Sequence, residues 1–199
     1  AENAAANGAE YYFGNEVIDI KRVDDIYNIK TKKDTYKTRW VVNAAGLYSD
    51  RVSKMLGIDD YTIHPCRGEY FILDEKVGSK LSLPAYPVPN PKEGGLGIHL
   101  TPTIDGNVFI GPSSEYIDER DDYSATQKIM DLLIKDGGRI FPHIRRDDFI
   151  RNFAGIRPKL ASKEEGGYHD FVIEMRDKSP NTINLVGIES PGLTSSTPI

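Results

Sequence analysis

The sequence has a single cysteine, fewer basic than acidic residues and no long apolar run, and each shortage excludes a class of protein. With Cys66 alone, neither a disulfide framework nor a cysteine metal cluster can form, and the histidines lack metal-ligand spacing, so no metal site is predicted. The net charge of −5 argues against nucleic acid as a partner, because a phosphate backbone requires a basic face. No transmembrane segment is expected, and the first residues indicate the tail of a helix rather than a signal peptide. The expected location is therefore the cytoplasm.

What remains is the composition of a globular protein, with 199 residues of which 39% are hydrophobic. This length is enough for one large domain or two small ones. Alternating and branched apolar segments predict an α+β fold with mainly antiparallel and mixed sheets and covering helices. Strands are expected at 9–13, 15–23, 26–31, 35–42, 69–73, 97–103, 107–111, 150–160, 171–175 and 182–186, and helices at 2–7, 49–56 (capped by Ser49) and 124–135 (ended by Gly137 and Gly138).

A change in character near residues 58–65 predicts a domain boundary. Residues 1–61, containing a β-meander, a strand and a helix, should form one layer together with residues 176–199. Residues 62–175 should form a second, sheet-rich domain inserted between them. Strand 182–186 should then lie beside strand 38–43, since both lead into turns that contain glycine.

The C-terminal stretch places a glycine-rich turn between a strand and a potential helix start. Gly187 ends strand 182–186, Pro191 and Gly192 predict a turn, and the hydroxyls at 194–196 could cap a helix. Such a structure presents backbone N–H groups to an anionic ligand. The pattern alone is more typical of an ordinary strand–turn–helix connection. Asn43-Ala44-Ala45-Gly46 is a stretch of the same kind, which allows either close approach to a ligand or tight packing of a helix on a sheet.

Three side chains in the second domain are candidates for chemistry. Arg157 is the only charge between Arg151 and Lys159 in a mostly apolar strand, and its planar guanidinium suits a carboxylate or phosphate. The alternative for Arg157 is a surface position or a structural ion pair. His99 is the best candidate for a general base, although a lone histidine in an apolar strand is also typical of a core residue. Tyr70 fits either a pocket hydroxyl or a half-buried packing residue.

The segment Gly187-Ile-Glu-Ser-Pro-Gly-Leu-Thr194 resembles the C-terminal flavin-binding segment of FAD-dependent oxidoreductases of the D-amino-acid-oxidase superfamily. The resemblance is to the branch with L-2-hydroxyglutarate oxidases and FAD-dependent glycerol-3-phosphate dehydrogenases, and it covers nearly the whole chain. It implies that residues 1–61 and 176–199 belong to an FAD-binding domain. It also implies a set of FAD contacts, namely Val17 to adenine, Ala44, Ala45 and Gly46 to the diphosphate and ribose, and Gly187, Ile188, Glu189, Ser190, Gly192, Leu193 and Thr194 to the flavin ring.

The same resemblance extends to the substrate domain, residues 62–175. Ala-Gly-Ile-Arg157-Pro-Lys159 resembles the family segment whose arginine binds the acidic group of the substrate, where Lys159 either assists or lies in solvent. Arg67-Gly-Glu-Tyr70 resembles the segment that opens this domain in the hydroxyglutarate branch, which implies roles for Arg67 and Tyr70 in the pocket. His99 lies in a segment resembling the family's His-Leu-Thr strand. The resemblance thus implies oxidation of a small anionic alcohol, glycerol 3-phosphate or, as these segments favour, an L-2-hydroxyglutarate-like hydroxy acid.

One family feature is missing from this sequence. The Gly-x-Gly-x-x-Gly turn that cradles the FAD pyrophosphate does not occur in the 199 residues. We therefore expect this chain to be part of a longer enzyme, inactive alone and binding FAD weakly or not at all. The alternative is a non-catalytic binding or interaction module that keeps the substrate sheet without cofactor. The electron acceptor of the reduced flavin is a further partner that the resemblance does not specify.

Overall fold

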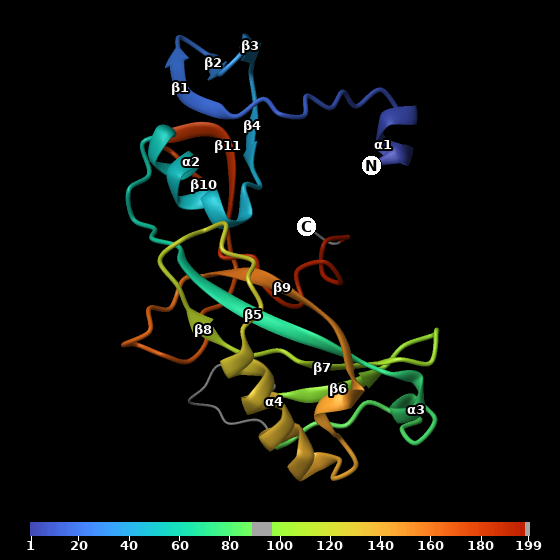
Figure 1. The fold of residues 1–199 in the computed structure, drawn as a ribbon. Coiled ribbons are helices and arrows are strands. Elements are labelled where there is room, and N and C mark those ends of the chain that lie inside the picture. Colours follow the sequence, from blue (N-terminus) through green and yellow to red (C-terminus); the bar gives the residue numbers. More distant parts are fainter. Residues whose placement is uncertain (89–96, 198–199) are drawn as a thin grey trace.

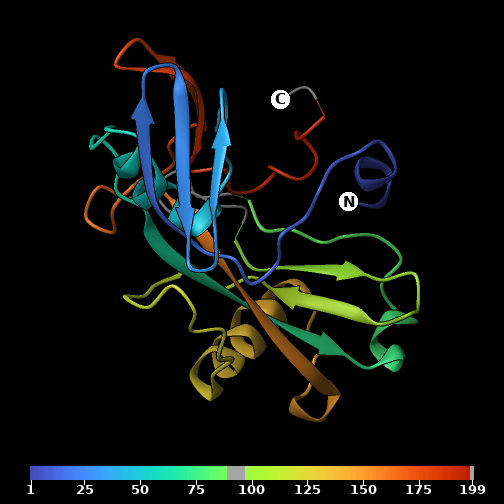
Figure 2. The same ribbon diagram turned by 90° about the horizontal axis from the view of Figure 1, so that it is seen from above.

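A computed structural model describes residues 1–88 and 97–197 of the protein. Two strand-rich parts meet in the middle of the molecule, with the C-terminal segment between them and α1 standing apart (Figures 1 and 2). The elements are α1 (Glu2–Ala6), β1 (Val17–Val23), β2 (Ile26–Thr31), β3 (Thr35–Thr38), β4 (Val41–Asn43), the single turn η1 (Gly46–Tyr48), α2 (Ser49–Met55), β5 (His64–Leu73), α3 (Glu75–Gly78), β6 (His99–Pro102), β7 (Val108–Gly111), β8 (Glu115–Tyr116), α4 (Gln127–Ile140), η2 (Arg146–Asp148), β9 (Phe149–Lys159), β10 (Val172–Arg176) and β11 (Ser179–Val186).

The larger part is an antiparallel sheet built around the long strand β5. Its order is β6-β7-β5-β8, and β9 pairs with β5 along its whole length. Helix α4 covers one face of this sheet (Figure 1). The main hydrophobic core lies between them, because alternate residues of the strands meet one apolar face of the helix. This core contains Phe71, Leu73, Val77, Leu100, Val108, Ile110, Ile129, Leu133 and Ile144. The α+β class and the mainly antiparallel sheet are thus confirmed.

The smaller part combines the β-meander β1-β2-β3 with a sheet of order β10-β11-β4. Strands β11 and β4 run parallel, with Thr182 opposite Val41 and Asn184 opposite Asn43, which confirms the expected pairing of these two segments. Strand β10 pairs with β11 and not with the large sheet, so sheet membership changes before residue 172. The domain limits at 61/62 and 175/176 stay a prediction.

Several local expectations were wrong. Residues 9–13 form no strand, because their backbone pairs with no described strand, and Tyr11 and Phe13 stack on each other in an exposed segment. The segment expected as one strand at 35–42 forms two strands, β3 and β4, which belong to different sheets. At the break between them, the Thr38 hydroxyl forms hydrogen bonds with the backbone of Trp40. Ser49 does not cap α2, since the cap position is Tyr48 and the buried Ser49 hydroxyl has no partner among the described residues.

Helix α4 continues past the two glycines that were expected to end it. Gly137 is buried inside the helix, and a Cβ there would lie 2.4 Å from Cδ1 of Ile110. The glycine therefore permits close packing of the helix on β7 instead of terminating the helix.

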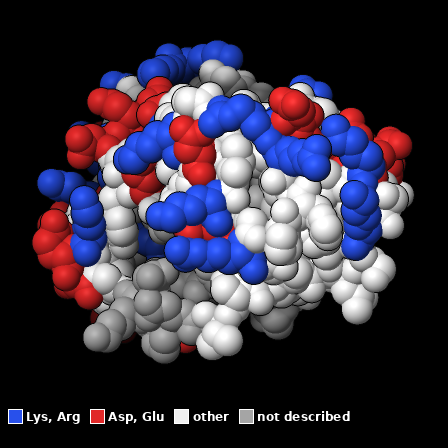
Figure 3. All heavy atoms as spheres, turned by 60° about the horizontal axis from the view of Figure 1, so that its bottom comes forward, with Lys and Arg blue, Asp and Glu red and all other residues white. Residues whose placement is uncertain are grey.

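Charged side chains of both signs are spread over the face seen in Figure 3. Several charges of α4 are paired, as in Arg139–Asp136 and Arg146–Asp131.

Candidate active site

The two faces of strand β5 have different roles. Successive side chains of a strand point to opposite faces, so Cys66, Gly68 and Tyr70 share one face and Arg67 and Glu69 the other. We call the face with Gly68 the front. The opposite face, which we call the back, packs against α4 and its preceding loop. The contacts agree, because Tyr70 stacks on the ring of Phe153 whereas the Glu69 carboxylate accepts the Thr126 N–H.

Arg157 lies on the front and reaches from β9 across β5. Its Nη1 and Nη2 atoms donate to the carbonyl oxygen of Ser113 at 3.4 and 3.3 Å, and Nη1 lies 3.9 Å from Sγ of Cys66. The side chain is half-buried, and no carboxylate lies within 4.0 Å of it in the described part of the chain. A guanidinium carries more N–H donors than one carbonyl can engage. Arg157 therefore presents a partly desolvated positive charge with donors left for an anion.

An aromatic group borders this arginine on the front. The rings of Tyr70 and Phe153 are stacked, with centroids 5.2 Å apart, and Phe109 meets Phe153 edge-on at 5.6 Å. The centroid of His99 lies 6.4 Å from that of Tyr70 and 4.7 Å from that of Tyr86. Burial raises the pKa of the Tyr70 hydroxyl, against the opposing effect of the Arg157 charge, so Tyr70 stays protonated at neutral pH.

His99 has a defined tautomer in this arrangement. Its Nδ1 lies 3.0 Å from the carbonyl oxygen of Gly97, which can only accept a hydrogen bond. Nδ1 must therefore carry the proton, and a neutral ring then keeps Nε2 free to accept one. The structure thus brings together three of the predicted residues, Tyr70, His99 and Arg157.

Lys159 is buried and pairs with a carboxylate of the C-terminal segment. Only 3% of it is exposed, and its Nζ lies 3.4 Å from the Glu189 carboxylate. Glu189 belongs to the glycine-rich C-terminal turn, so this ion pair ties β9 to the segment 187–194. The geometry favours a role in holding that turn over direct contact with a substrate.

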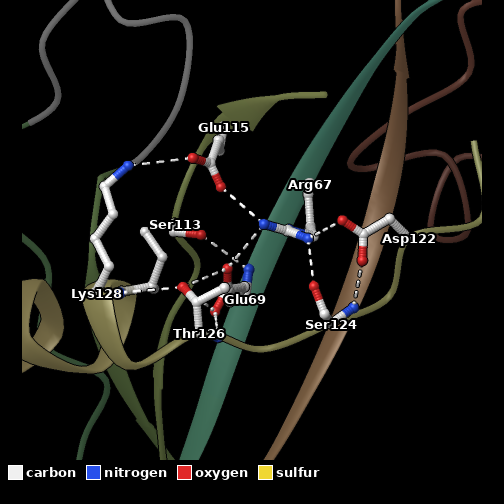
Figure 4. Close-up of polar contacts among 9 residues, drawn as sticks. Arg67, Glu69, Ser113, Glu115, Asp122, Ser124, Thr126 and Lys128 are labelled. Atoms are coloured by element: carbon white, nitrogen blue, oxygen red, sulfur yellow. Dashed lines mark hydrogen bonds and ion pairs between the residues drawn. The ribbon is translucent and has the colours of Figure 1, made fainter. Parts of the chain in front are cut away.

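Arg67 lies on the back of β5, away from Arg157. It is 5% exposed, and its guanidinium contacts the carboxylates of Asp122 and Glu115 and the hydroxyl of Ser124 (Figure 4). Carboxylates and the Ser124 hydroxyl thus engage both terminal nitrogens of the guanidinium, Nη1 and Nη2. Side chains along a strand alternate between its two faces, so residues 67 and 70, three positions apart, point to opposite faces. Arg67 therefore cannot share a pocket with Tyr70 while β5 is formed.

The two glycine turns lie at one edge of the parallel pair β4–β11. Asn43 and Asn184 are opposite each other, and each is followed three residues later by a glycine in the left-handed region, Gly46 (φ 54°) and Gly187 (φ 70°). Parallel strands end at the same edge, so both turns emerge side by side. A Cβ on Gly46 would meet nothing within 4 Å, whereas one on Gly187 would lie 2.5 Å from Leu160. The backbone at Gly46 therefore borders open space, and Gly187 is required by packing.

A buried polar cluster beneath these turns was missed by the sequence reasoning. The Asn43 amide donates to Oδ1 of Asn184 at 2.6 Å and to the Ser49 carbonyl at 2.8 Å. Ser53 donates to the same Asn184 oxygen at 2.9 Å, while Nδ2 of Asn184 has no partner among the described residues. The available signal was the repeated Asn-x-x-Gly spacing, in Asn43 to Gly46 and Asn184 to Gly187.

The remaining predicted contacts lie in the smaller part and in the C-terminal segment. Val17 begins β1 opposite Thr31 and packs against the small core of Ile20, Tyr27, Val41 and Leu56. Ala44 is exposed and the N–H of Ala45 donates to the Asn43 side chain at 3.2 Å. Among the predicted contacts in the C-terminal segment, Ser190, Leu193 and Thr194 are exposed, and Ile188, Glu189 and Gly192 are half-buried.

Neither a membrane span nor a metal cluster occurs in residues 1–88 and 97–197. Within these ranges, no helix is both long and apolar enough to cross a membrane. The same described residues contain no group of three or more His, Cys, Asp or Glu side chains arranged to hold a metal ion.

The chain is similar to known flavoenzymes over its whole length. The family model for FAD-dependent oxidoreductases (DAO) matches residues 1–199. A glycerol 3-phosphate dehydrogenase of Caloramator mitchellensis is 37% identical, covering 98% of this chain and 39% of that protein. A mitochondrial L-2-hydroxyglutarate dehydrogenase of Arabidopsis thaliana is 37% identical, covering 78% of this chain and 35% of that protein. The chain therefore spans well under two thirds of these relatives.

Solved structures show the same likeness. The FAD-bound, dithionite-reduced L-α-glycerophosphate oxidase of Mycoplasma pneumoniae superposes with a TM-score of 0.71 at 26% identity, over 90% of this chain and 46% of that one. A glycine oxidase of Bacillus cereus superposes with a TM-score of 0.75 at 19% identity, over 94% of this chain and 48% of that one, which shows a shared fold.

Proposed function

The chain belongs to the family of FAD-dependent oxidoreductases, and we propose that it supplies the substrate-binding part of an enzyme that oxidises a small anionic alcohol. Two substrates of this class follow from the relatives, L-2-hydroxyglutarate and glycerol 3-phosphate. Both carry a hydroxyl on the carbon to be oxidised and an acidic group a short distance away. The same site chemistry, an anchor for the anion and an acceptor for the hydroxyl proton, would serve either.

The observation that carries this proposal is Arg157. A half-buried arginine has lost part of its hydration, and it lacks a compensating carboxylate among the described residues. A bound carboxylate or phosphate would supply the missing charge through paired hydrogen bonds. The stacked rings of Tyr70 and Phe153 border that contact with apolar surface.

The residues present fit FAD, which would supply the hydride acceptor when bound. The open space beside Gly46 and the Nδ2 atom of Asn184, which has no partner within residues 1–88 and 97–197, lie next to two turns whose backbone is suited to a cofactor. We assign Val17, Ala44, Ala45 and Gly46 to the nucleotide end, and the backbone of 187–194 to the flavin ring, with Lys159 and Glu189 holding that turn. The 199 residues alone should bind FAD weakly or not at all, because they lack the pyrophosphate-binding glycine turn.

The side chains of the front have separate tasks in this proposal. Arg157 anchors the acidic group and so fixes the orientation of the substrate. His99 accepts the hydroxyl proton at Nε2, because Nδ1 is held protonated by Gly97. Tyr70 and Phe153 form the apolar border of the substrate position. We also propose a cytoplasmic location, because the only cysteine, Cys66, is buried and has no second cysteine with which to pair.

The full-length enzyme should be reduced by an anionic alcohol and not by its neutral counterpart. We expect anaerobic mixing with L-2-hydroxyglutarate or glycerol 3-phosphate to bleach the visible absorbance of the flavin, because Arg157 holds the anion. Glycerol and the dimethyl ester of 2-hydroxyglutarate, which lack the charge, should react at least about tenfold more slowly at equal concentration. Equal rates with charged and neutral alcohols would contradict the proposed substrate class.

A further inference from the structure

The Arg157 side chain lies directly on the backbone of β5 at Gly68. A Cβ built on Gly68 would be 2.7 Å from Nη2 of Arg157 and 3.0 Å from its Cζ, closer than non-bonded atoms approach. Any side chain at position 68 would therefore push the guanidinium off the sheet. The glycine of the Arg-Gly-Glu-Tyr segment thus makes room for an arginine that comes from another strand.

The Arg157 side chain, which crosses β5, ends at Ser113. Its carbonyl oxygen accepts from both Nη atoms of Arg157, at 3.4 and 3.3 Å. Ser113 itself is 3% exposed and is fixed to β5 in two ways. Its N–H donates to the Glu69 carbonyl at 3.1 Å, and its hydroxyl accepts the Glu69 N–H at 3.0 Å. The carbonyl that holds the arginine is therefore held in turn by the strand that the arginine crosses.

Contacts on the back of β5 hold the segment that follows Ser113. The Glu69 carboxylate accepts the N–H of Thr126, the residue that caps α4, at 2.6 Å. Arg67 contacts Glu115 at 2.9 Å and the Ser124 hydroxyl at 2.6 Å (Figure 4). The connection from Ser113 to α4 is thus fastened to Arg67 and Glu69 along its length. These two residues stabilise, from the hidden face, the carbonyl that Arg157 uses on the front.

We propose that Gly68 and Ser113 are positioning residues for substrate recognition, which together fix the Arg157 guanidinium across β5 with its remaining donors directed at the anion. This inference rests on the proposed function, because it assumes that Arg157 binds the substrate. A fixed guanidinium loses little freedom when the anion binds, so it favours affinity. Disturbing either residue should therefore weaken binding of the anionic substrate more than it slows turnover.

The first test replaces Ser113 in the full-length enzyme. Ser113→Ala removes the hydroxyl that accepts the Glu69 N–H and loosens the carbonyl. KM for the anionic alcohol that reduces the flavin should rise roughly three- to tenfold, with kcat within about twofold. Ser114→Ala is the matched control, because Ser114 is exposed and its hydroxyl contacts Sγ of Cys66 and not Glu69. KM of this control should stay within about twofold of the original.

The second test leaves the Ser113 hydrogen bonds intact and moves the arginine directly. Gly68→Ala should raise KM by a similar factor, since the added methyl group displaces the guanidinium. Both variants are then repeated in the Arg157→Ala background, where there is no guanidinium to position. There Ser113→Ala and Gly68→Ala should change kcat/KM by less than about twofold, so the effects are not additive. If Ser113→Ala does not fold, the Gly68→Ala cycle decides alone.

The outcomes separate this inference from the proposed function. If Ser113→Ala and Gly68→Ala lower kcat/KM by the same factor with and without Arg157, they act on the fold and the positioning role is overturned. It is equally overturned if neither changes KM while Arg157→Ala does. If Arg157→Ala alone leaves the anionic substrate unaffected, the proposed function has failed instead.

Discussion

Replacing Arg157 by alanine in the full-length enzyme should lower kcat/KM for the anionic substrate at least roughly tenfold. The change removes charge-assisted hydrogen bonds to a carboxylate or phosphate, each worth about 1.5–3 kcal/mol. Arg157→Lys should restore the rate only in part, because an ammonium cannot reproduce the planar fork of donors. Steady-state kinetics with L-2-hydroxyglutarate and glycerol 3-phosphate provide the measurement.

Arg151→Ala is the matched control for this prediction. Arg151 lies on the same strand β9, six residues before Arg157, and is exposed. Arg151→Ala should leave kcat/KM within about twofold of the value for the original enzyme, as is usual for a surface change. The kcat/KM for a neutral alcohol should change little in either variant. If Arg157→Ala lowers activity on charged and neutral alcohols alike, the defect is one of stability, and Arg157 would be structural.

Replacing Arg67 by methionine should cause the largest loss of stability. The Glu69 carboxylate is fully buried, and Arg67 lies 3.5 Å from it. Removing one partner of a buried ion pair leaves an uncompensated charge, which costs about 3–5 kcal/mol. Thermal unfolding of the full-length enzyme should show a clearly lower Tm. Adding Glu69→Gln to Arg67→Met should recover part of the loss, because the buried charge is then gone.

Arg139→Met is the matched control for Arg67. Its side chain is 71% exposed and its ion pair with Asp136 lies on the surface of α4. Surface pairs contribute about 0–1 kcal/mol, so the Tm should barely move. A Tm for Arg67→Met equal to that of Arg139→Met would show that the buried network is dispensable.

The sequence was sufficient for what depends on local patterns. Strands β1 and β2 followed from alternation, and the pairing of 182–186 with the segment before Gly46 followed from the two glycine turns. Gly137 was misjudged because helix termination is local, whereas its close contact with Ile110 comes from tertiary packing. The hydrogen bond between Asn43 and Asn184 was missed although both residues precede a glycine by three positions, because that spacing does not fix which side chains meet across the strand pair.

Arg67 and Tyr70 were both expected in one pocket, because the strand was predicted from residue 69 and Arg67 stood before it. Strand β5 begins at His64, so it includes Arg67. Alternation along β5 then places Arg67 and Glu69 on one face and Gly68 and Tyr70 on the other. What alternation could not provide is the Ser113 carbonyl, which reaches Arg157 only through the path of the chain after β7.

The most direct test of Arg157 as an anion anchor is a binding titration without turnover. Glutarate and inorganic phosphate, which lack the oxidisable hydroxyl, are added to the full-length holoenzyme at constant ionic strength while the visible absorbance of the flavin is recorded. At least one should perturb the spectrum saturably, and Arg157→Ala should raise its Kd at least roughly tenfold, whereas Arg151→Ala should not. Equal Kd values for the original enzyme and Arg157→Ala would contradict the role of Arg157 as the anchor.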